Sequence, residues 1–397
     1  MDNLVLIHGA LGNAKEFDEI SSFLSKRYNV LIYEIPHHGV KSDTTIPFTI
    51  ESLTIDLENY ISEIGSCFVY GFSLGGYIVL SLAQKGNNHI KGIITQGTKL
   101  DWSPNTALKE TQSLDVDFLK NKAKPFYDYL FSLHGSYLPK LLDKTASFMI
   151  ELGSSPTLSA ESVKSISCPV RMIRGGKDRM VTKEETLKIC NAINNSFYFE
   201  VPGFIHPLGF INPKYIARAI EVQINSFTYK WANTKYGDFA YKSYGAFNNK
   251  PVLLFLHEAI GSIAQWKDFP EKVSNSLNLP AIILEFPGYG FSSEYNNKRD
   301  DKYLHHFALD QLPAFLESIN LSQDIIIIGH SDGGTNALLY SSKYPDKVKG
   351  IVTMAAHVLN EQETKEGVSP AIEAFESGKM KSLEIYHGAK TESLFYA

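Results

Sequence analysis

The chain has 397 residues, too many for one ordinary hydrophobic core, so we expect two domains. Hydrophobic residues make up 44% and charged residues 20% of the chain, which is typical of a soluble globular protein and excludes a disordered or membrane-embedded one. The formal net charge of −5 gives no electrostatic reason to expect nucleic acid or an anionic lipid surface as a partner.

The amino terminus reads MDNLVLIHG, with an acidic residue where a signal peptide has basic ones, and we find no apolar run long enough to span a membrane. The three cysteines, Cys67, Cys168 and Cys190, are an odd number and form no C-x-x-C pair. This pattern favours small buried side chains in a reducing compartment over a disulfide framework or a metal site. The cytoplasm is the simplest location.

Short apolar runs alternate with helical patterns along the chain. A helix is predicted to start at Asn13, with Glu16 three residues later completing a capping box. A second amphipathic helix carries Leu53, Leu57, Tyr60, Ile61 and Ile64. Residues 30–33 and 325–328 are apolar at every position, as in strands buried on both faces of a parallel sheet. The alternation predicts a doubly wound, mostly parallel α/β sheet with helices on both faces, whose ligands bind beyond the carboxyl ends of the strands.

The same landmarks occur twice in the same order. The first half has HGALG at residues 8–12 and GFSLGG at 71–76, and the second half has HEAIG at 257–261 and GHSDGG at 329–334. The offset grows only from 249 residues at the first landmark to 258 at the second. We therefore expect two tandem domains, residues 1–227 and 228–397, divided where a helix-like sequence gives way to a strand-like one.

The G-F-S-L-G segment follows an apolar strand and opens a helix, a context that favours a nucleophilic role for Ser73 over a plain glycine turn. Such a bend lifts the hydroxyl above the sheet edge, and Gly71 and Gly75 allow neighbouring backbone to come close. The N–H of Leu74 at the start of the helix, with that of Ala10 in the H-G turn, would then donate to a developing oxyanion.

The base and the acid that orients it are expected after the serine, in the order acid and then histidine. Asp178 follows an apolar strand in a Gly-Gly-Lys-Asp turn, and His206 follows the next strand. This order predicts a triad in which Asp178 holds the imidazole of His206 while the imidazole serves Ser73.

With these residues in place, the chain resembles the α/β-hydrolase family over nearly its whole length. Residues 1–227 look like a complete member that lacks the usual first two strands, with residues 101–165 as the helical cap. The resemblance implies acyl transfer to water on an ester, thioester or lactone-type small molecule, without cofactor or metal. Aromatic residues of the cap are expected to form its core and to line a pocket for apolar bulk: Trp102, Phe118, Phe126, Tyr127, Tyr129, Phe131, Tyr137 and Phe148.

Two alternatives to a simple hydrolase stay open. One is a hydrolase-shaped binding module without turnover. The other is a synthase or lyase like that of the menaquinone pathway, but its polyanionic substrate favours arginines, and residues 101–165 contain none. The segment IPHHGVKSD departs from the family pattern, and we expect its His37 and His38 to be surface residues rather than metal ligands.

The second copy has a nucleophile-like Ser331, with Ala259 and Asp332 as probable oxyanion donors and Glu258 in place of the glycine of the H-G turn. Asp178 and His206 follow Ser73 by 105 and 133 residues, and the same spacings from Ser331 end beyond Ala397. We therefore expect the second copy to lack its last strands and its triad acid and base, and to be inactive. Two readings stay open: a natural chain that continues further, or a degenerate remnant whose bare sheet edge pairs with a neighbour or a second copy.

Asp332 and Asp346 lie in turns and His387 among cap-like helices, so none of them matches a strand-end acid or base. His357 follows a strand, but we do not expect it to reach Ser331.

Overall fold

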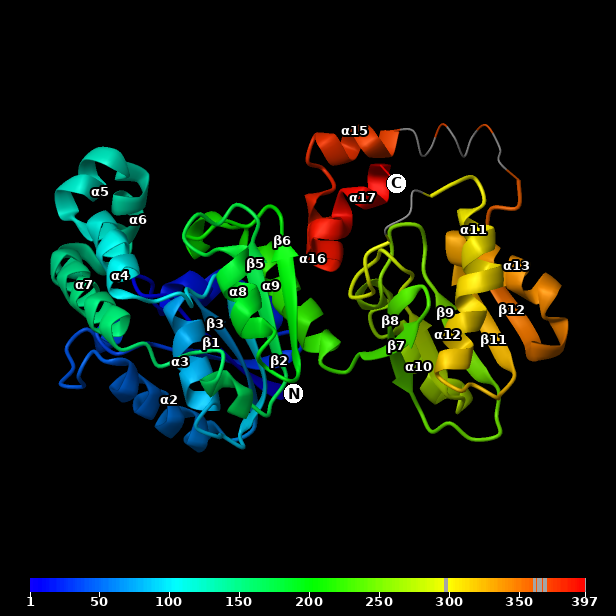
Figure 1. Ribbon diagram of the computed structural model, residues 1–397, viewed down its shortest axis with the longest axis horizontal. Coiled ribbons are helices and arrows are strands. Elements are labelled where there is room, and N and C mark those ends of the chain that lie inside the picture. The colour runs from blue at the N-terminus through cyan, green and yellow to red at the C-terminus, as the bar shows by residue number, and fades with distance from the viewer. Residues whose placement is uncertain (296–298, 360–361, 363–365, 367–369, 397) are drawn as a thin grey trace. The chain divides into compact units, whose positions relative to one another are not determined.

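The computed structural model describes residues 1–295, 299–359, 362, 366 and 370–396. The chain forms two compact units, Met1–Phe227 and Thr228–Ala397. We call them unit 1 and unit 2. Each has its own six-stranded sheet and its own hydrophobic core (Figure 1).

The sheet of unit 1 is parallel throughout, in the order β2-β1-β3-β4-β5-β6. Its strands are β1 (Asp2–Ile7), β2 (Tyr28–Tyr33), β3 (Cys67–Phe72), β4 (Ile90–Gln96), β5 (Val170–Gly175) and β6 (Ser196–Val201). The flanking helices are α1 (Asp18–Leu24), α2 (Ile50–Ile64), α3 (Leu74–Ala83), α8 (Lys183–Cys190) and α9 (Pro213–Ser226). Because helices cover the sheet on both faces, central strands such as β1 and β3 bury successive apolar side chains. The predicted doubly wound α/β class is confirmed.

Local signals in the sequence account for where the first helices of unit 1 begin. The predicted capping box is present, since the Asn13 N–H donates to Glu16 Oε2 at 3.2 Å while the Asn13 side chain accepts backbone bonds in return. It starts a 3₁₀ turn, Ala14–Phe17, that leads into α1. Helix α2 begins after Thr49, whose side chain accepts from the N–H of Ser52.

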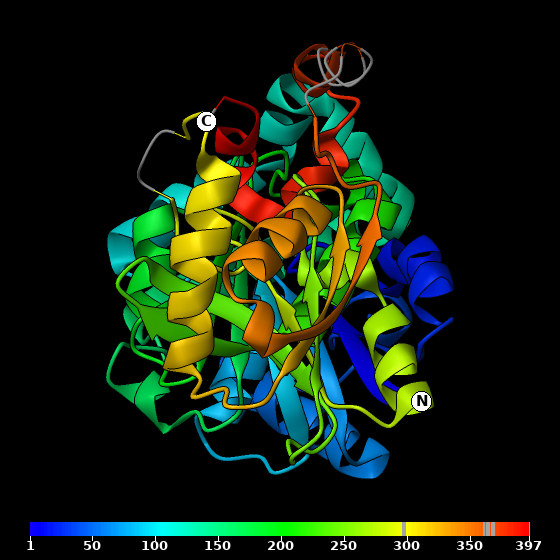
Figure 2. The same cartoon turned by 90° about the vertical axis from the view of Figure 1, so that its right-hand side faces the viewer.

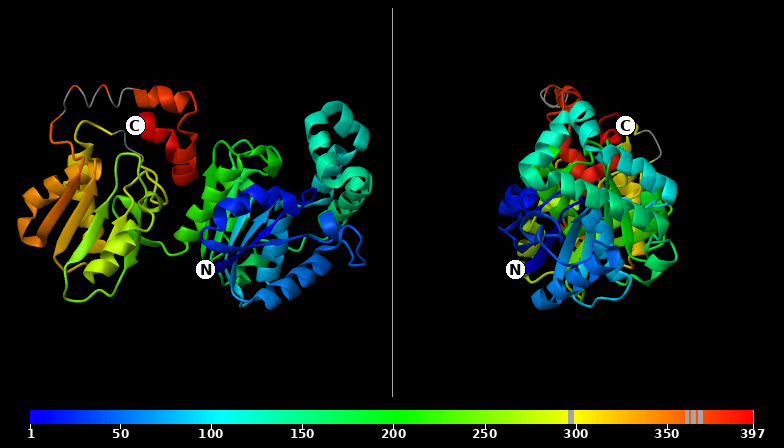
Figure 3. Two further views of the ribbon diagram at one scale, coloured as in Figure 1. Left: turned by 180° about the vertical axis from the view of Figure 1, so that it is seen from behind. Right: turned by 90° about the vertical axis from the view of Figure 1, so that its left-hand side faces the viewer.

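Between β4 and β5 the chain leaves the sheet and forms four helices: α4 (Pro104–Thr111), α5 (Val116–Lys122), α6 (Lys124–His134) and α7 (Leu138–Ser154). Helix α4 packs on α7 and α5 packs on α6. Figures 1 and 3 show the four helices as one cluster beside the sheet. This cluster is the helical cap expected at residues 101–165.

Unit 2 repeats four strands of unit 1 and adds a hairpin. Its sheet order is β12-β11-β9-β10-β8-β7. The parallel strands β9 (Val252–Leu256), β10 (Ala281–Leu284), β11 (Ile325–His330) and β12 (Val348–Met354) correspond to β1, β2, β3 and β4. The antiparallel pair β7 (Lys230–Thr234) and β8 (Gly237–Tyr244) lies beside β10. Among the described residues of unit 2, β12 is the last strand.

The helices of unit 2 include α10 (Phe269–Leu277), α11 (Tyr303–His306), α12 (Leu312–Ser318) and α13 (Asp332–Lys343), the last of which starts directly after β11. Helices α15 (Pro370–Glu376), α16 (Glu384–His387) and α17 (Ser393–Tyr396) follow later in the chain (Figure 2). The order strand, sharp turn, helix at β11–α13 is the same as at β3–α3 in unit 1.

Candidate active site

Ser73 occupies the one-residue bend between β3 and α3, with φ of 49° and ψ of −113°. A residue with a side chain rarely adopts this conformation, so the bend stores strain that the surrounding structure must hold. Two glycines make the bend possible. A Cβ at Gly71 would lie 2.5 Å from the backbone N of Gly76, and a Cβ at Gly75 would lie 2.6 Å from the carbonyl oxygen of Ile7. The expected strand–serine–helix geometry is therefore present.

The structure brings Ser73, His206 and Asp178 together from three loops. Ser73 Oγ lies 3.3 Å from His206 Nε2, and His206 Nδ1 lies 2.9 Å from Asp178 Oδ2. The Asp178 side chain is 1% exposed and that of His206 is 20% exposed. In this arrangement Nδ1–H donates to the carboxylate, which leaves Nε2 free to accept the hydroxyl proton of Ser73.

The Asp178 carboxylate is held in its ionised form. Burial raises its pKa, but the hydrogen bond and charge of His206 and the N–H groups of Val181 and Met180 outweigh burial, so the pKa is lowered from its ordinary value. Those two N–H groups donate to Oδ1 at 3.0 and 2.8 Å, respectively. Oδ1 is thus occupied by the loop, and Oδ2 is left for the imidazole.

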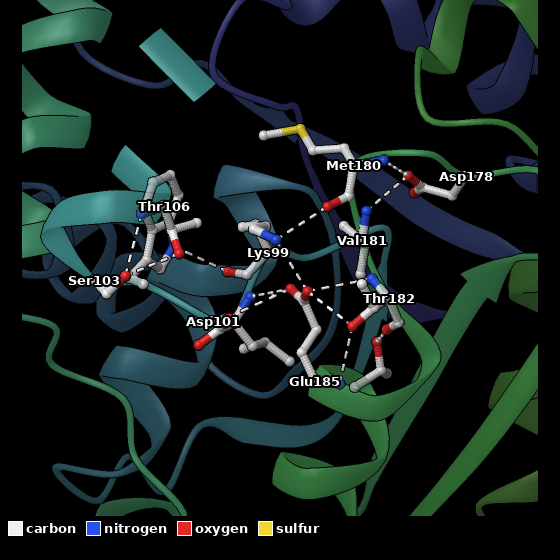
Figure 4. A network of polar contacts seen from close by, with 12 residues as sticks. Lys99, Asp101, Ser103, Thr106, Asp178, Met180, Val181, Thr182 and Glu185 are labelled. Carbon is white, nitrogen blue, oxygen red and sulfur yellow. Dashed lines mark hydrogen bonds and ion pairs between the residues drawn. The ribbon is translucent and has the colours of Figure 1, made fainter. Parts of the chain in front are cut away.

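A buried ion pair supports the loop that carries Asp178 (Figure 4). Lys99 Nζ donates to Glu185 Oε2 at 3.0 Å and to the carbonyl oxygen of Met180 at 3.1 Å. Glu185 Oε1 accepts from the N–H of Leu100 at 2.9 Å, and Oε2 accepts from Thr182 at the start of α8. The network therefore joins the end of β4, the Asp178 loop and α8.

The two expected oxyanion donors lie where the sequence places them. Leu74 is the first residue of α3, and Ala10 lies in the turn after β1. Among the backbone hydrogen bonds of the described residues, neither Ala10 N–H nor Leu74 N–H donates one, whereas the next amide, Gly75 N–H, donates to His8 O at 3.1 Å. Both donors therefore stay available to a ligand.

Histidines fix the turn that carries Ala10. His38 Nε2 makes a short hydrogen bond to the carbonyl oxygen of Ala10, and His134 Nε2, from the cap helix α6, lies 2.9 Å from the carbonyl oxygen of Leu11. The expectation that His37 and His38 lie on the surface is wrong, because they are only 4% and 0% exposed. Burial, followed by the charge of His8, lowers the pKa of His38 to about 3, so this ring is neutral at physiological pH.

Sequence reasoning missed this positioning role of the histidines. Among the described residues, no group of three or more His, Cys, Asp and Glu side chains is arranged to hold a metal ion.

A cavity of about 190 Å³ opens beside Ser73 and His206. Its apolar wall includes Phe72 and Met180 from the core and Leu114, Phe126, Leu130 and Met149 from the cap. Of the eight cap aromatics, Phe126 and Tyr129 line this cavity. Others pack in the cap, whereas Phe118 and Phe131 are about half exposed and do not line the cavity, although the Phe131 ring stacks on that of Tyr127.

The cap is tied to the oxyanion turn by three hydrogen bonds. Tyr129 Oη donates to Glu16 Oε1 at 2.5 Å, and Asn13 Nδ2 donates to the carbonyl oxygen of Leu133 at 3.1 Å. The contact of His134 with Leu11 is the third. A ligand that moves the cap would therefore also move the Ala10 amide.

The second elbow is as well formed as the first. Ser331 has φ of 50° and ψ of −117°, and a Cβ at Gly333 would lie 2.0 Å from the carbonyl oxygen of Leu256. Asp332 is the first residue of α13, and Ala259 lies in the turn after β9, as expected of oxyanion donors. Glu258, which replaces the glycine of the H-G turn, lies 3.3 Å from His330 Nδ1 through its Oε2.

The expectation that His357 does not reach Ser331 is wrong. His357 Nε2 lies 3.3 Å from Ser331 Oγ, the same distance as in unit 1. The Thr335 hydroxyl fixes the backbone of His357, because it donates to the His357 carbonyl at 2.8 Å and accepts from its N–H at 3.1 Å. Within the described part of unit 2, no carboxylate is hydrogen-bonded to the His357 ring.

His387 is fully buried and has a counterpart in unit 1. Its Nδ1 accepts from the N–H of Gly290 at 3.1 Å, so Nε2 carries the proton and donates to the carbonyl oxygen of Ile260 at 3.1 Å. Ile260 corresponds to Leu11, and His387 therefore does in unit 2 what His134 does in unit 1. The repeated His-Gly pair, at 134–135 and 387–388, is the sequence signal for this role.

A family model described as the alpha/beta hydrolase fold matches residues 2–132 and 251–377, together more than half of the chain. The chain therefore belongs to the α/β-hydrolase fold family, as two tandem copies. The resemblance inferred from the two sets of landmarks is confirmed.

Three similar proteins illustrate this relationship. The biotin biosynthesis bifunctional protein BioHC of Teredinibacter turnerae is 29% identical over 133 residues, which cover 32% of this chain and 22% of that protein. The sn-1-specific diacylglycerol lipase ABHD11 of Danio rerio is 29% identical over 112 residues, or 27% of this chain and 34% of that protein. The crystal structure of the enol-lactonase from Burkholderia xenovorans LB400 has a TM-score of 0.45 and 20% identity, covering 57% of this chain and 90% of that one.

The chain thus matches only about a fifth to a third of the length of these two curated relatives. Family membership and the relatives together support a hydrolase function. No helix within the described ranges combines the length and the apolar character needed to cross a bilayer.

Proposed function

We propose that unit 1 is a serine hydrolase that transfers the acyl group of a small-molecule ester, thioester or lactone to water. This proposal rests on the hydrogen-bonded triad beside the apolar cavity: Ser73 Oγ lies 3.3 Å from His206 Nε2, and His206 Nδ1 lies 2.9 Å from Asp178 Oδ2. A serine, histidine and aspartate at these distances match the arrangement that activates a serine hydroxyl for acyl transfer.

In the first half of the reaction, Ser73 Oγ attacks the carbonyl carbon of the substrate while His206 Nε2 takes the hydroxyl proton. The negative charge on the former carbonyl oxygen is stabilised by the N–H groups of Ala10 and Leu74. Asp178 stabilises the imidazolium of His206, which then protonates the leaving alkoxide or thiolate. An acyl group remains bound to Ser73.

In the second half, water takes the place of the alcohol. His206 Nε2 removes a proton from the water as its oxygen attacks the acyl carbon, and the same proton returns to Ser73 Oγ when the acid leaves. The strained bend at Ser73 keeps Oγ in the open through both halves.

The two alternatives are less well supported. A binding module without turnover has no need for a strained serine in contact with a paired histidine. A synthase or lyase that binds a polyanion needs cationic side chains, and among the described residues that line the cavity none is lysine or arginine.

Ser73→Ala tests this proposal on the full chain. We expect the variant to keep its circular dichroism spectrum and melting temperature but to lose turnover of every member of an ester, thioester and lactone panel. Ser331→Ala is the matched control and should keep the rates of the wild type. Retained turnover in Ser73→Ala would refute the assignment.

For unit 2 we propose that Ser331 turns over slowly or not at all, because His357 has no carboxylate to orient it within the described residues. For the location we propose the cytoplasm, since Cys67, Cys168 and Cys190 are all free thiols.

A further inference from the structure

We propose that the cavity of unit 1 selects substrate groups that end in a hydrogen-bond donor and rejects groups that end in a carboxylate, with Glu16 as the specificity-determining residue. The inference rests on the proposed function, because it names the substrate class of the same site. It starts from the Glu16 carboxylate, which faces a cavity whose wall is mostly apolar.

The two carboxylates that line the cavity are Glu16 and Glu110, whereas an adjoining pocket, which shares Glu110 and His206 with it, is lined also by the cations Lys109, Lys177 and Arg179. None of the described residues that line the cavity itself is lysine or arginine. Both glutamates are partly exposed. A carboxylate placed beside Glu16 would lose its hydration and meet like charge, because the three cations line the adjoining pocket and not the cavity itself. A hydroxyl or ammonium group would instead find an acceptor.

Glu16 is positioned to be that acceptor. Its Oε2 accepts from the N–H of Asn13 at 3.2 Å and its Oε1 accepts from Tyr129 Oη at 2.5 Å. Both oxygens act as acceptors, as in an ionised carboxylate, while burial raises the pKa of this group above its ordinary value. Each oxygen keeps a further lone pair, so the pair Glu16–Tyr129 leaves room for a donor from a ligand.

Two glycines make the space for this pair. A Cβ at Gly12 would lie 1.8 Å from Glu16 Oε2, and a Cβ at Gly209 would lie 2.3 Å from Tyr129 Oη. Gly12 lies in the oxyanion turn and Gly209 follows β6, so segments far apart in the chain both accommodate the polar pair. A cavity of about 190 Å³ is several times the ~30 Å³ share of one water molecule, and so has room for a substrate chain that reaches the pair.

Unit 2 shows that the fold does not require an acid here. The residue that corresponds to Glu16 is Gln265, which follows Ser262 at the start of the equivalent 3₁₀ turn and accepts from its hydroxyl at 3.0 Å. The equivalent turn therefore forms with a neutral side chain at this position, without the capping box that Glu16 makes in unit 1. At this position only unit 1 therefore has an acidic residue.

The test uses full-length protein and four thioesters of equal chain length: hexanoyl, ω-hydroxyhexanoyl, ω-aminohexanoyl and adipoyl with a free carboxylate. A second series carries the same end groups on the alcohol side of acetate esters. At about pH 8, where carboxyl groups are ionised, we expect kcat/KM to be roughly tenfold lower for the carboxylate-ended member than for the methyl-ended one. The hydroxyl- or ammonium-ended member should be the best in at least one series.

Glu16→Gln should raise the carboxylate-to-methyl ratio of kcat/KM by about tenfold and remove the advantage of the donor-ended substrates. Glu151→Gln in α7 is the matched control, because it removes the same charge from an exposed position of the cap that does not line the cavity, and it should change the ratio less than about twofold. An uncharged fluorophosphonate verifies that Ser73 still reacts in each variant.

Equal rates for carboxylate- and methyl-ended substrates in both series of the wild type would overturn the inference, even if Glu16→Gln failed to fold. So would an unchanged ratio in a folded Glu16→Gln variant. If the wild type cleaves no member of either series and its Ser73 does not react, the proposed function itself fails.

Discussion

Ser73 and Ser331 have nearly the same strained backbone conformation, and each lies 3.3 Å from the Nε2 atom of a histidine. The histidines come from different parts of the fold. His206 follows the sixth strand of unit 1, whereas His357 follows β12, the counterpart of the fourth strand. Of these two histidines, only His206 has a carboxylate hydrogen-bonded to its ring among the described residues. We expect the two serines to differ in reactivity for this reason.

Asp178→Asn should reduce kcat/KM by about 10⁴-fold, because an amide neither stabilises the imidazolium nor fixes the tautomer that serves Ser73. The measurement is steady-state turnover of the best ester or thioester of the panel. Asp128→Asn, on the exposed face of the cap, is the control and should leave kcat/KM unchanged. A loss of less than about tenfold in Asp178→Asn would mean that the acid is another residue.

The lowered pKa of Asp178 also predicts a dependence of stability on pH. A carboxyl whose pKa is lower in the folded than in the unfolded state stabilises the fold above its ordinary pKa, and the contribution is lost as the pH falls through the folded value. Between about pH 5 and about pH 2, the free energy of unfolding should therefore fall more steeply in the wild type than in Asp178→Asn. Urea unfolding across this range measures both slopes, and parallel curves would contradict the prediction.

Lys99→Met should destabilise the protein by about 3 kcal/mol, because it leaves the buried Glu185 carboxylate without its cation. It should also lower kcat, since Lys99 holds the Met180 carbonyl in the loop of Asp178. Lys124→Met, which breaks the exposed pair with Asp128, is the control and should cost less than about 1 kcal/mol. Similar losses in both variants would show that the buried network does not support the loop.

Phe126→Ala should shift substrate preference toward bulkier groups, because this ring lines the cavity beside Ser73. Phe131→Ala removes the same side chain from the same helix at a position that is 48% exposed, and should leave the preference unchanged. The ratio of kcat/KM for a long and a short acyl thioester measures the shift. An unchanged ratio in Phe126→Ala would argue against the idea that the cap sets substrate choice.

The fold followed from local patterns in the sequence. The fully apolar run 325–328 forms the inner strand β11 as predicted, whereas the run 30–33 forms the edge strand β2 and is only partly buried. The glycines around Ser73 mark a close backbone approach that the structure shows at Gly71 and Gly75. The order of Ser73, Asp178 and His206 placed each at the end of a different strand. Parallel strands present those ends at one edge of the sheet, so the three residues meet.

Contacts between residues far apart in the chain could not be predicted from local sequence patterns. His38 looked like a surface residue because nothing in a single sequence reveals that its ring reaches the Ala10 carbonyl, 28 residues earlier. His357 is not expected to reach Ser331 from the sequence, because no strand-end acid followed by a strand-end histidine comes after that serine, yet His357 Nε2 lies 3.3 Å from Ser331 Oγ. The spacing of the first copy predicts only residues that both copies share, and His357 is a residue of the second copy alone.

The most direct test of the account is the rate at which a fluorophosphonate modifies each serine of the full chain, followed by mass-spectrometric mapping of the adducts. We predict rapid modification of Ser73 that is lost in His206→Ala, and modification of Ser331 slower by at least about 10³-fold, because its histidine lacks an orienting carboxylate within the described residues. Absence of an adduct at Ser73, or equal rates at the two serines, would contradict the claim that unit 1 alone carries a working triad.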